Sequence, residues 1–262
     1  MPYETIVCGV DGGLATITLN RPDKRNAMNA AMFRELGDAA EEAANDDAVR
    51  VVLVRGEGAS FCAGIDLTGF GEQLAPPPEQ TREFIGVAQR PFAVLAGMAK
   101  PTVAAVQGHA LGAGCQLALA CDLRVAAEGA SFGILELNFG IIPDLGGNAR
   151  LAAVVGPARA KELIWTSARF DATAAERWGV VNRVVPADDL HAAAEALARE
   201  VAGRAPLPVR HVKALVDRAG SEPLEAVMAS ERDAQAECLA SDDHKEAVAA
   251  YFERREPRFQ GR

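Results

Sequence analysis

Two turns rich in small residues are the first candidates for chemistry in this sequence. One covers residues 60–67 (Ser-Phe-Cys-Ala-Gly-Ile-Asp-Leu) and the other residues 108–116 (Gly-His-Ala-Leu-Gly-Ala-Gly-Cys-Gln). Each would leave backbone N–H groups free at the start of a helix, and two such donors that converge form an oxyanion hole. An oxyanion hole stabilises negative charge that develops on a carbonyl oxygen. Taken singly, either turn is better explained as small residues that allow close packing of a helix on a strand.

A second candidate is Ser131, because residues 129–133 (Gly-Ala-Ser-Phe-Gly) match the G-x-S-x-G pattern of serine hydrolases. Asp144 and His191 follow in the chain order of a hydrolase triad. The pattern requires a strand before the serine and a long helix directly after it, whereas a glycine and a proline follow too soon. A serine hydrolase is therefore a minor alternative, which a fluorophosphonate probe would reveal by labelling Ser131.

The elements that must position these turns alternate between strands and helices. Apolar runs with period-2 character predict strands, and apolar residues at helical spacing predict helices. The predicted order is a hairpin over 6–10 and 14–19, a helix over 27–44, a strand over 49–55, a Gly/Pro-rich loop over 68–80, a helix over 81–98, a strand over 102–106, a short helix over 115–120 and a strand over 122–126.

The strand, turn and helix of residues 102–120 repeat the plan of residues 50–67, which favours stacked ββα units over a flat doubly wound sheet. After about residue 145 the pattern is mostly helical. A helix over 190–201 is interrupted by Pro206 and Pro208, and three more helical stretches follow to about residue 255. We expect an α/β core over residues 1–200 and a C-terminal helical subdomain over residues 201–262.

Composition excludes several classes of protein. The 262 residues are 49% hydrophobic and carry 36 acidic against 27 basic side chains, a formal net charge of −9. An acidic protein is a poor partner for nucleic acid or an anionic membrane, so neither is expected. The apolar segments are too short to span a bilayer, no targeting signal is evident, and a cytoplasmic location is expected. Four scattered histidines and five cysteines without paired spacing predict no metal site.

The two turns, together with their surroundings, resemble the crotonase family (enoyl-CoA hydratase/isomerase). The resemblance runs nearly from end to end. It rests on Leu-Asn-Arg-Pro at 19–22 with Arg-Asn-Ala-Met at 25–28, Phe-Cys-Ala-Gly-Ile-Asp-Leu at 61–67, the segment from Lys100-Pro101 to Cys121-Asp122, residues 132–147, and Tyr-Phe-Glu-Arg-Arg at 251–255.

Membership would imply a spiral of ββα units, a homotrimer or homohexamer, and an acyl-CoA thioester substrate. No cofactor is expected, because coenzyme A is part of the substrate. By position, the resemblance assigns the two oxyanion N–H groups to Ile65 and Ala113. Backbone donation leaves the side chains at these two positions free to vary.

The resemblance also assigns three catalytic candidates: Glu136, Asp144 and Gln116. Hydratases of the family use two glutamates, and here the first position is Gln116 and the second is Glu136. A glutamine can hydrogen-bond water or substrate, but it cannot exchange a proton at neutral pH. Asp144 lies where several branches keep an acid/base carboxylate. We therefore expect an enoyl-CoA or dienoyl-CoA isomerase that uses Glu136 and/or Asp144.

Two alternatives remain open. One is a hydratase in which Glu136 acts while Gln116 orients water, and the other is a non-catalytic acyl-CoA-binding protein. Asp144 has a structural explanation too, as the N-cap of a helix over 145–155, and Glu136 alone could be a solvated carboxylate. The resemblance places the following residues at the substrate or its CoA moiety: Lys24, Arg25, Ala27, Ala63, Asp66, Leu67 and Arg254.

Overall fold

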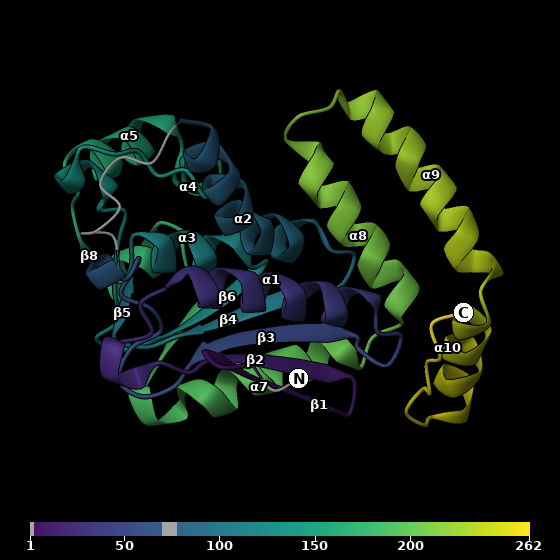
Figure 1. The fold of residues 1–262 in the computed structure, drawn as a ribbon. Helices are drawn as coiled ribbons and strands as arrows, with labels where there is room; N and C mark the ends of the chain where they lie inside the picture. The colour runs from purple at the N-terminus through teal and green to yellow at the C-terminus, as the bar shows by residue number, and fades with distance from the viewer. Residues whose placement is uncertain (1–2, 70–77) are drawn as a thin grey trace.

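The structure, a computed structural model, describes residues 3–69 and 78–262. Its strands form two sheets (Figure 1). The large sheet has the order β1-β2-β3-β4-β6-β9 and consists of β1 (Ile6–Asp11), β2 (Leu14–Leu19), β3 (Val51–Gly56), β4 (Thr102–Val106), β6 (Leu123–Ala127) and β9 (Arg183–Val185). The small sheet has the order β5-β7-β8 and consists of β5 (His109–Leu111), β7 (Ser131–Gly133) and β8 (Phe170–Asp171).

The chain passes back and forth between the two sheets, which confirms the predicted spiral. β1 and β2 form the predicted antiparallel hairpin, and β2, β3, β4, β6 and β9 are parallel neighbours. After β4 the chain enters β5, and after β6 it enters β7, which pairs with β5 in parallel. The turn after β3 is linked in the same way, because Cys62 forms an isolated parallel bridge with Ala110 of β5. Each turn of the spiral therefore ends beside the previous one.

Helices cover both faces of the large sheet. The helices of the core are α1 (Ala30–Asn45), α2 (Pro78–Gly97), α3 (Ala113–Ala120), α4 (Gly147–Val155), α5 (Pro157–Trp165), α6 (Ala172–Arg177) and α7 (Leu190–Ala202). α7 packs on β3, β4 and β6 through a small apolar core, while a larger core lies between the other face and the helices α1, α2 and α3 (Figure 1). Because both faces are covered, β4 is buried along its whole length, as expected for a central parallel strand.

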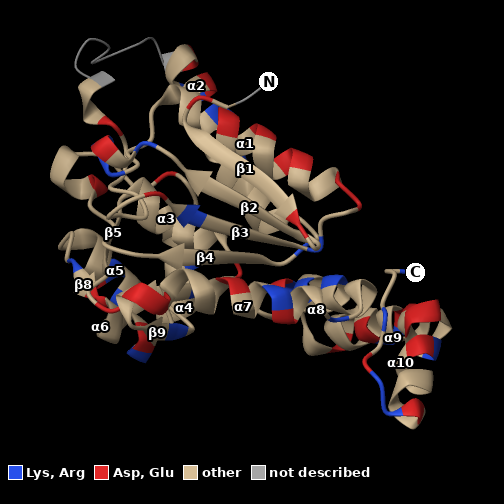
Figure 2. Ribbon diagram, turned by 90° about the horizontal axis from the view of Figure 1, so that it is seen from below, with Lys and Arg blue, Asp and Glu red and all other residues tan. Residues whose placement is uncertain are grey.

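The last three helices stand beside this core: α8 (Pro206–Ala219), α9 (Leu224–Ala240) and α10 (Asp242–Glu253) (Figure 1). An ion pair of 2.8 Å between Lys213 of α8 and Asp122 ties α8 to the core. Figure 2 shows that acidic and basic residues are interspersed along these helices. Among the described residues, no helix combines the length and apolar character that crossing a membrane requires.

Several predicted boundaries need correction. The first helix begins at Ala30, because the side chain of Asn29 accepts from Met32 N–H and caps the helix there. Residues 78–80 belong to α2, so the predicted loop over 68–80 is too long; its residues 70–77 lie outside the described residues. The helix expected from residue 145 begins at Gly147.

Candidate active site

The two small-residue turns lie directly against each other. Cys62 N–H donates to the carbonyl of His109 at 2.8 Å, and Leu111 N–H donates to the carbonyl of Cys62 at 3.0 Å. A Cβ atom built on Gly114 would come within 2.2 Å of the Cys62 carbonyl oxygen. Only glycine permits this approach, so the two turns can pack against each other only because residue 114 is a glycine.

The joined turns present two unpaired backbone donors. Ala113 is the first residue of α3, and its N–H has no acceptor within the helix. Beside Ile65, the hydrogen bonds are made by its neighbours: Met28 N–H donates to Gly64, and Asp66 N–H donates to Met28. Within residues 3–69 and 78–262, neither Ile65 N–H nor Ala113 N–H has a hydrogen-bond acceptor.

These two N–H groups are neighbours in space as well. A Cβ atom on Gly64 would lie 3.9 Å from the Ala113 nitrogen, and a Cβ atom on Gly112 would lie 3.9 Å from the Gly64 Cα. Gly112 precedes α3 with a φ of 52°, a conformation that favours glycine. The structure therefore brings together the two donors that the resemblance singles out.

Glu136 lies beside this pair of turns. It begins the short helix η3 (Glu136–Phe139), and only 6% of its surface is exposed. A Cβ atom on Gly112 would be 3.4 Å from Glu136 Oε1. Oε1 accepts a hydrogen bond from Gln116 Nε2 at 2.6 Å, whereas Oε2 is buried and has no partner among the described residues. Glu136 is therefore not the solvated carboxylate that it could have been on sequence grounds.

Gln116 connects α3 to the start of α4. Its Oε1 accepts from Leu145 N–H at 3.0 Å and from Gly147 N–H at 2.9 Å. A Cβ atom on Gly147 would come within 2.7 Å of the Gln116 side chain, so a glycine is needed there. No sequence pattern indicated this contact, which joins residues about thirty positions apart.

The two carboxylates share a low-polarity environment. Burial raises the pKa of Glu136 above its ordinary value, against hydrogen bonds that lower it, and the negative charge of Asp144 adds to the rise. Burial likewise raises the pKa of Asp144. Asp144 is not a helix cap: the N-cap of α4 is Gly146, with a φ of 89° and no side-chain cap. The capping explanation is therefore wrong.

Residues 24–28 run alongside the first turn and form one corner of the site. Ala63 N–H donates to the carbonyl of Arg25 at 2.9 Å. Arg25 and Asn26 both have left-handed backbones, with φ of 50° and 55°, which is costly for residues other than glycine. The buried Asn26 side chain holds this conformation by donating to the carbonyls of Glu57 and Ser60. Sequence reasoning missed Asn26, whose role depends on these distant partners.

The predicted substrate residues of this corner differ in how far their side chains are exposed to solvent. Lys24 and Arg25 are exposed, and Leu67 is 55% exposed. The Asp66 carboxylate, in contrast, accepts from the Thr68 hydroxyl at 2.6 Å and pairs with Arg21 at 2.8 Å. These two contacts lower the pKa of Asp66 to about 2. The Asp66 side chain is thus engaged within the protein, and its part in substrate binding remains a prediction.

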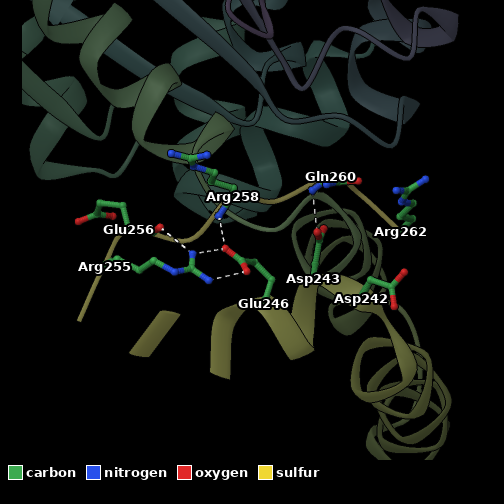
Figure 3. A pocket seen from close by; sticks show the side chains of 8 residues that line it. All are labelled: Asp242, Asp243, Glu246, Arg255, Glu256, Arg258, Gln260 and Arg262. Carbon is green, nitrogen blue, oxygen red and sulfur yellow. Dashed lines mark hydrogen bonds and ion pairs between the residues drawn. The ribbon is translucent and has the colours of Figure 1, made fainter. Parts of the chain in front are cut away.

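Arg254 is not brought to this corner within the chain. It is the C-cap of α10, which lies beyond α8 and α9 from the core (Figure 1). The tail that follows folds back on α10: Glu246 accepts from the Arg255 side chain and from Arg258 N–H (Figure 3). The pocket between them is lined by Asp242, Asp243, Glu246, Arg255, Glu256, Arg258, Gln260 and Arg262.

The contacts that line this pocket hold the C-terminal tail against α10, and the pocket is not a candidate active site. Its Asp243 accepts from Gln260 N–H and Gly261 N–H, and its Glu246 pairs with Arg255 at 2.5 Å, so both carboxylates are engaged within the protein. The tail is also tied to the core, because Arg50 at the start of β3 donates to the carbonyl of Phe259 at 2.6 Å. The tail therefore fixes α10 in place.

The serine-hydrolase alternative lacks its structural context. Ser131 lies in β7 and pairs with Asp171 of β8, and its N–H donates to the carbonyl of Gly108. The short helix η3 follows in place of a long helix. His191 belongs to α7, which covers the opposite face of the large sheet.

Comparison with known proteins agrees with this geometry. Residues 9–262 match the family model described as enoyl-CoA hydratase/isomerase. A probable enoyl-CoA hydratase of Mycobacterium bovis is 38% identical over 99% of both chains, and a crotonyl-CoA hydratase of Syntrophomonas wolfei is 37% identical over 99% of both. The crystal structure of a putative enoyl-CoA hydratase from Thermobifida fusca in complex with CoA is 36% identical, with a TM-score of 0.85 over 90% of this chain and 93% of that one.

The two-sheet spiral is the crotonase fold, and the protein is a crotonase-superfamily enzyme. More narrowly, the chain belongs to the enoyl-CoA hydratase/isomerase family. The preference for an isomerase finds no support in these relatives, which are described as hydratases.

Proposed function

We propose that this protein is an enoyl-CoA hydratase, which adds water across the C2–C3 double bond of a 2-enoyl-CoA thioester. The observation that carries the proposal is the buried Oε2 of Glu136, which lies beside the N–H groups of Ile65 and Ala113. Among residues 3–69 and 78–262, Oε2 has no hydrogen-bond partner and neither N–H group has an acceptor. A buried acceptor without a hydrogen bond costs about 1–3 kcal/mol of stability, and a bound water or substrate would supply the missing donor. The names of the relatives support the same choice.

In the proposed mechanism the thioester oxygen accepts from Ile65 N–H and Ala113 N–H. Ionised Glu136 takes a proton from a water molecule as the water oxygen bonds to C3. The π electrons move through C2 onto the thioester oxygen, where each backbone donor contributes about 3 kcal/mol of transition-state stabilisation. Protonated Glu136 then gives the proton to C2, and the carbonyl re-forms. One water is consumed and the enzyme is regenerated.

Burial suits Glu136 to both halves of this cycle. A carboxyl group at its ordinary pKa is a weak base and is rarely protonated at neutral pH. The raised pKa of Glu136 brings its two forms closer in free energy, which favours proton transfer in both directions.

For the CoA moiety we propose the corner formed by Lys24, Arg25, Ala27, Ala63 and Leu67. Its two exposed cations can attract phosphate groups despite the acidic net charge. Of the two other candidates, Asp66 is already engaged with Thr68 and Arg21, and Arg254 would meet CoA only from a neighbouring subunit, because it lies at the far end of α10.

We further propose that the protein forms a homotrimer or homohexamer. The helices beyond the core carry large apolar side chains in solvent, including Tyr251 at 80% exposure and Phe252 at 77%. Val212, Val216, Leu224 and Met228 are also more than half exposed. Large apolar side chains exposed in such number on neighbouring helices are typical of a surface that another chain covers.

A double-bond isomerase is the second candidate, and a specific observation favours it. Asp144 acts electrostatically on Glu136, while Gln116 replaces a carboxylate that could serve a second proton transfer. In an isomerase acting on a 3-enoyl-CoA, one carboxylate would remove a proton from C2, and the same or the other would deliver it to C4 as the double bond moves to C2–C3.

Mass spectrometry in deuterated water separates these candidates. The protein is incubated with 2-enoyl-, 3-enoyl- and dienoyl-CoA esters. A hydratase yields a product heavier by one D₂O from the 2-enoyl ester. Deuterium exchange without gain of water would identify an isomerase and refute the hydratase. Binding of the esters without either change would identify a non-catalytic acyl-CoA-binding protein.

A further inference from the structure

The amide of Gln116 has one possible orientation. Its Oε1 accepts from two backbone N–H groups, of Leu145 and Gly147, at 3.0 and 2.9 Å. Turning the amide over would place its NH₂ group against these two donors, which would leave all three without an acceptor. The orientation is therefore set by the backbone at the start of α4.

This orientation decides where Glu136 can hold a proton. With Oε1 of Gln116 occupied, its Nε2 faces Glu136 Oε1 at 2.6 Å and donates to it. Oε1 of Glu136 must accept that hydrogen bond whether the carboxyl group is ionised or protonated. The exchangeable proton is therefore carried by Oε2, the atom that has no partner in the described part of the protein.

We propose that Gln116 is a positioning residue that clamps Oε1 of Glu136 and confines the transferable proton to Oε2, so that this one atom both takes and returns the proton. The inference rests on the proposed chemistry at Glu136. Oε2 removes one proton from water while the water oxygen bonds to C3, and the same Oε2–H bond breaks as the C2–H bond forms. Gln116 neither gains nor loses a proton.

The geometry also explains why a neutral side chain suits position 116. A carboxylate there would accept from the same two backbone N–H groups, which stabilise its ionised form. It would then face Oε1 of Glu136 with a like charge, so the proton that the pair shares would reside mainly on Glu136. Glutamine supplies a donor in place of this repulsion.

Other charged groups around Glu136 act less directly. Asp144 raises the pKa of Glu136. The adjacent Cys115 thiol is fully buried, and burial raises its pKa to about 12, so it is neutral at working pH. α5 packs on η3 with the apolar Ala160, Leu163 and Ile164 buried, and its charged residues are exposed. Gln116 is thus the polar side chain that the structure places in hydrogen-bonding contact with the carboxylate of Glu136.

The first test is the pH profile of 2-enoyl-CoA hydration by Gln116→Glu. This variant keeps an oxygen that can accept from both Leu145 N–H and Gly147 N–H, and so should fold. We expect the acidic limb to move to higher pH by about one unit or more, with KM nearly unchanged, because the donor to Oε1 of Glu136 is replaced by a like charge. An unshifted acidic limb would overturn the proposal.

The second test does not depend on turnover. Infrared titration follows the C=O stretch of protonated Glu136, which is assigned by its loss in Glu136→Gln. Gln116→Met adds no new carboxyl group, and loss of the donor should raise the titration midpoint. Thr102→Val, which removes a partly buried hydrogen bond to Asp122, is the control and should leave the midpoint unchanged.

Equal midpoints in Gln116→Met and the parent would refute the clamp. If the parent enzyme turns over no enoyl-CoA but its infrared midpoint still shifts in Gln116→Met, the proposed function fails while the clamp holds. The two failures are therefore distinguishable.

Discussion

Replacing Glu136 by glutamine should change activity and stability in opposite directions. The substitution keeps the shape of the side chain, and the new amide oxygen can still accept from Gln116 Nε2 in place of Oε1. It removes the one group that exchanges the proton in the proposed mechanism. Loss of a general acid/base costs about 10²- to 10⁴-fold in rate, or about 3–5 kcal/mol of barrier. We expect kcat for 2-enoyl-CoA hydration to fall by that factor while KM changes little.

The stability effect follows from the raised pKa of Glu136. The folded protein binds this proton more tightly than the unfolded chain does, so stability falls as pH rises from the unfolded pKa through the folded pKa. At neutral pH the buried ionised carboxylate is thus destabilising, and Glu136→Gln should unfold at a higher denaturant concentration than the parent. Below the unfolded pKa, near 4, the difference from this source should disappear.

Both effects are measured on the same preparations. Hydration is followed by loss of the ultraviolet absorbance of the conjugated thioester, and unfolding by circular dichroism in urea from pH 4 to 8. Glu128→Gln, at an exposed glutamate, is the control and should change neither quantity. A variant that keeps its activity within a few-fold, or that is less stable than the parent at pH 7.5, would refute the assignment of Glu136.

Three further predictions concern other parts of the site. Ala113→Pro removes an oxyanion donor at a helix position that tolerates proline, and should lower kcat by about 10²- to 10³-fold, whereas Ala113→Gly keeps the N–H and should stay within a few-fold in the same assay. Asp144→Asn should move the acidic limb of the pH profile to lower pH, since it removes the negative charge that raises the pKa of Glu136; a hundredfold loss of rate would instead favour the isomerase. Aspartate substitutions at Tyr251 and Phe252 should shift the assembly toward monomer in sedimentation velocity, and an unchanged sedimentation coefficient would place the subunit contacts elsewhere.

Much of the fold can be predicted from the sequence, because its strands are short apolar runs between turns. The hairpin, the central strands and the repeat of strand, turn and helix all follow from local patterns. Boundaries were less predictable where a side chain or a glycine decides them: Asn29 caps α1, and the left-handed Gly146 delays α4 by two residues. Asp144 does not cap α4, because the helix begins only after the left-handed Gly146.

The site was predictable to a different degree. The resemblance singles out Ile65, Ala113 and Glu136 as candidates, because their positions are set by motifs within single segments. The bonds from Gln116 to Leu145, Gly147 and Glu136 could not be predicted, because they join three segments that meet only after folding. The sequence shows at position 116 only that a carboxylate is absent, which favours an isomerase, and does not show the three hydrogen bonds that Gln116 makes.

The most direct test of the account is a crystal structure of the protein with a bound acyl-CoA. The distances from the thioester oxygen to the nitrogens of Ile65 and Ala113 should both be about 2.7–3.1 Å, and Oε2 of Glu136 should be the carboxylate atom that faces C2. A thioester oxygen bound away from either nitrogen, or a C2 atom that faces a different carboxylate, would contradict the account.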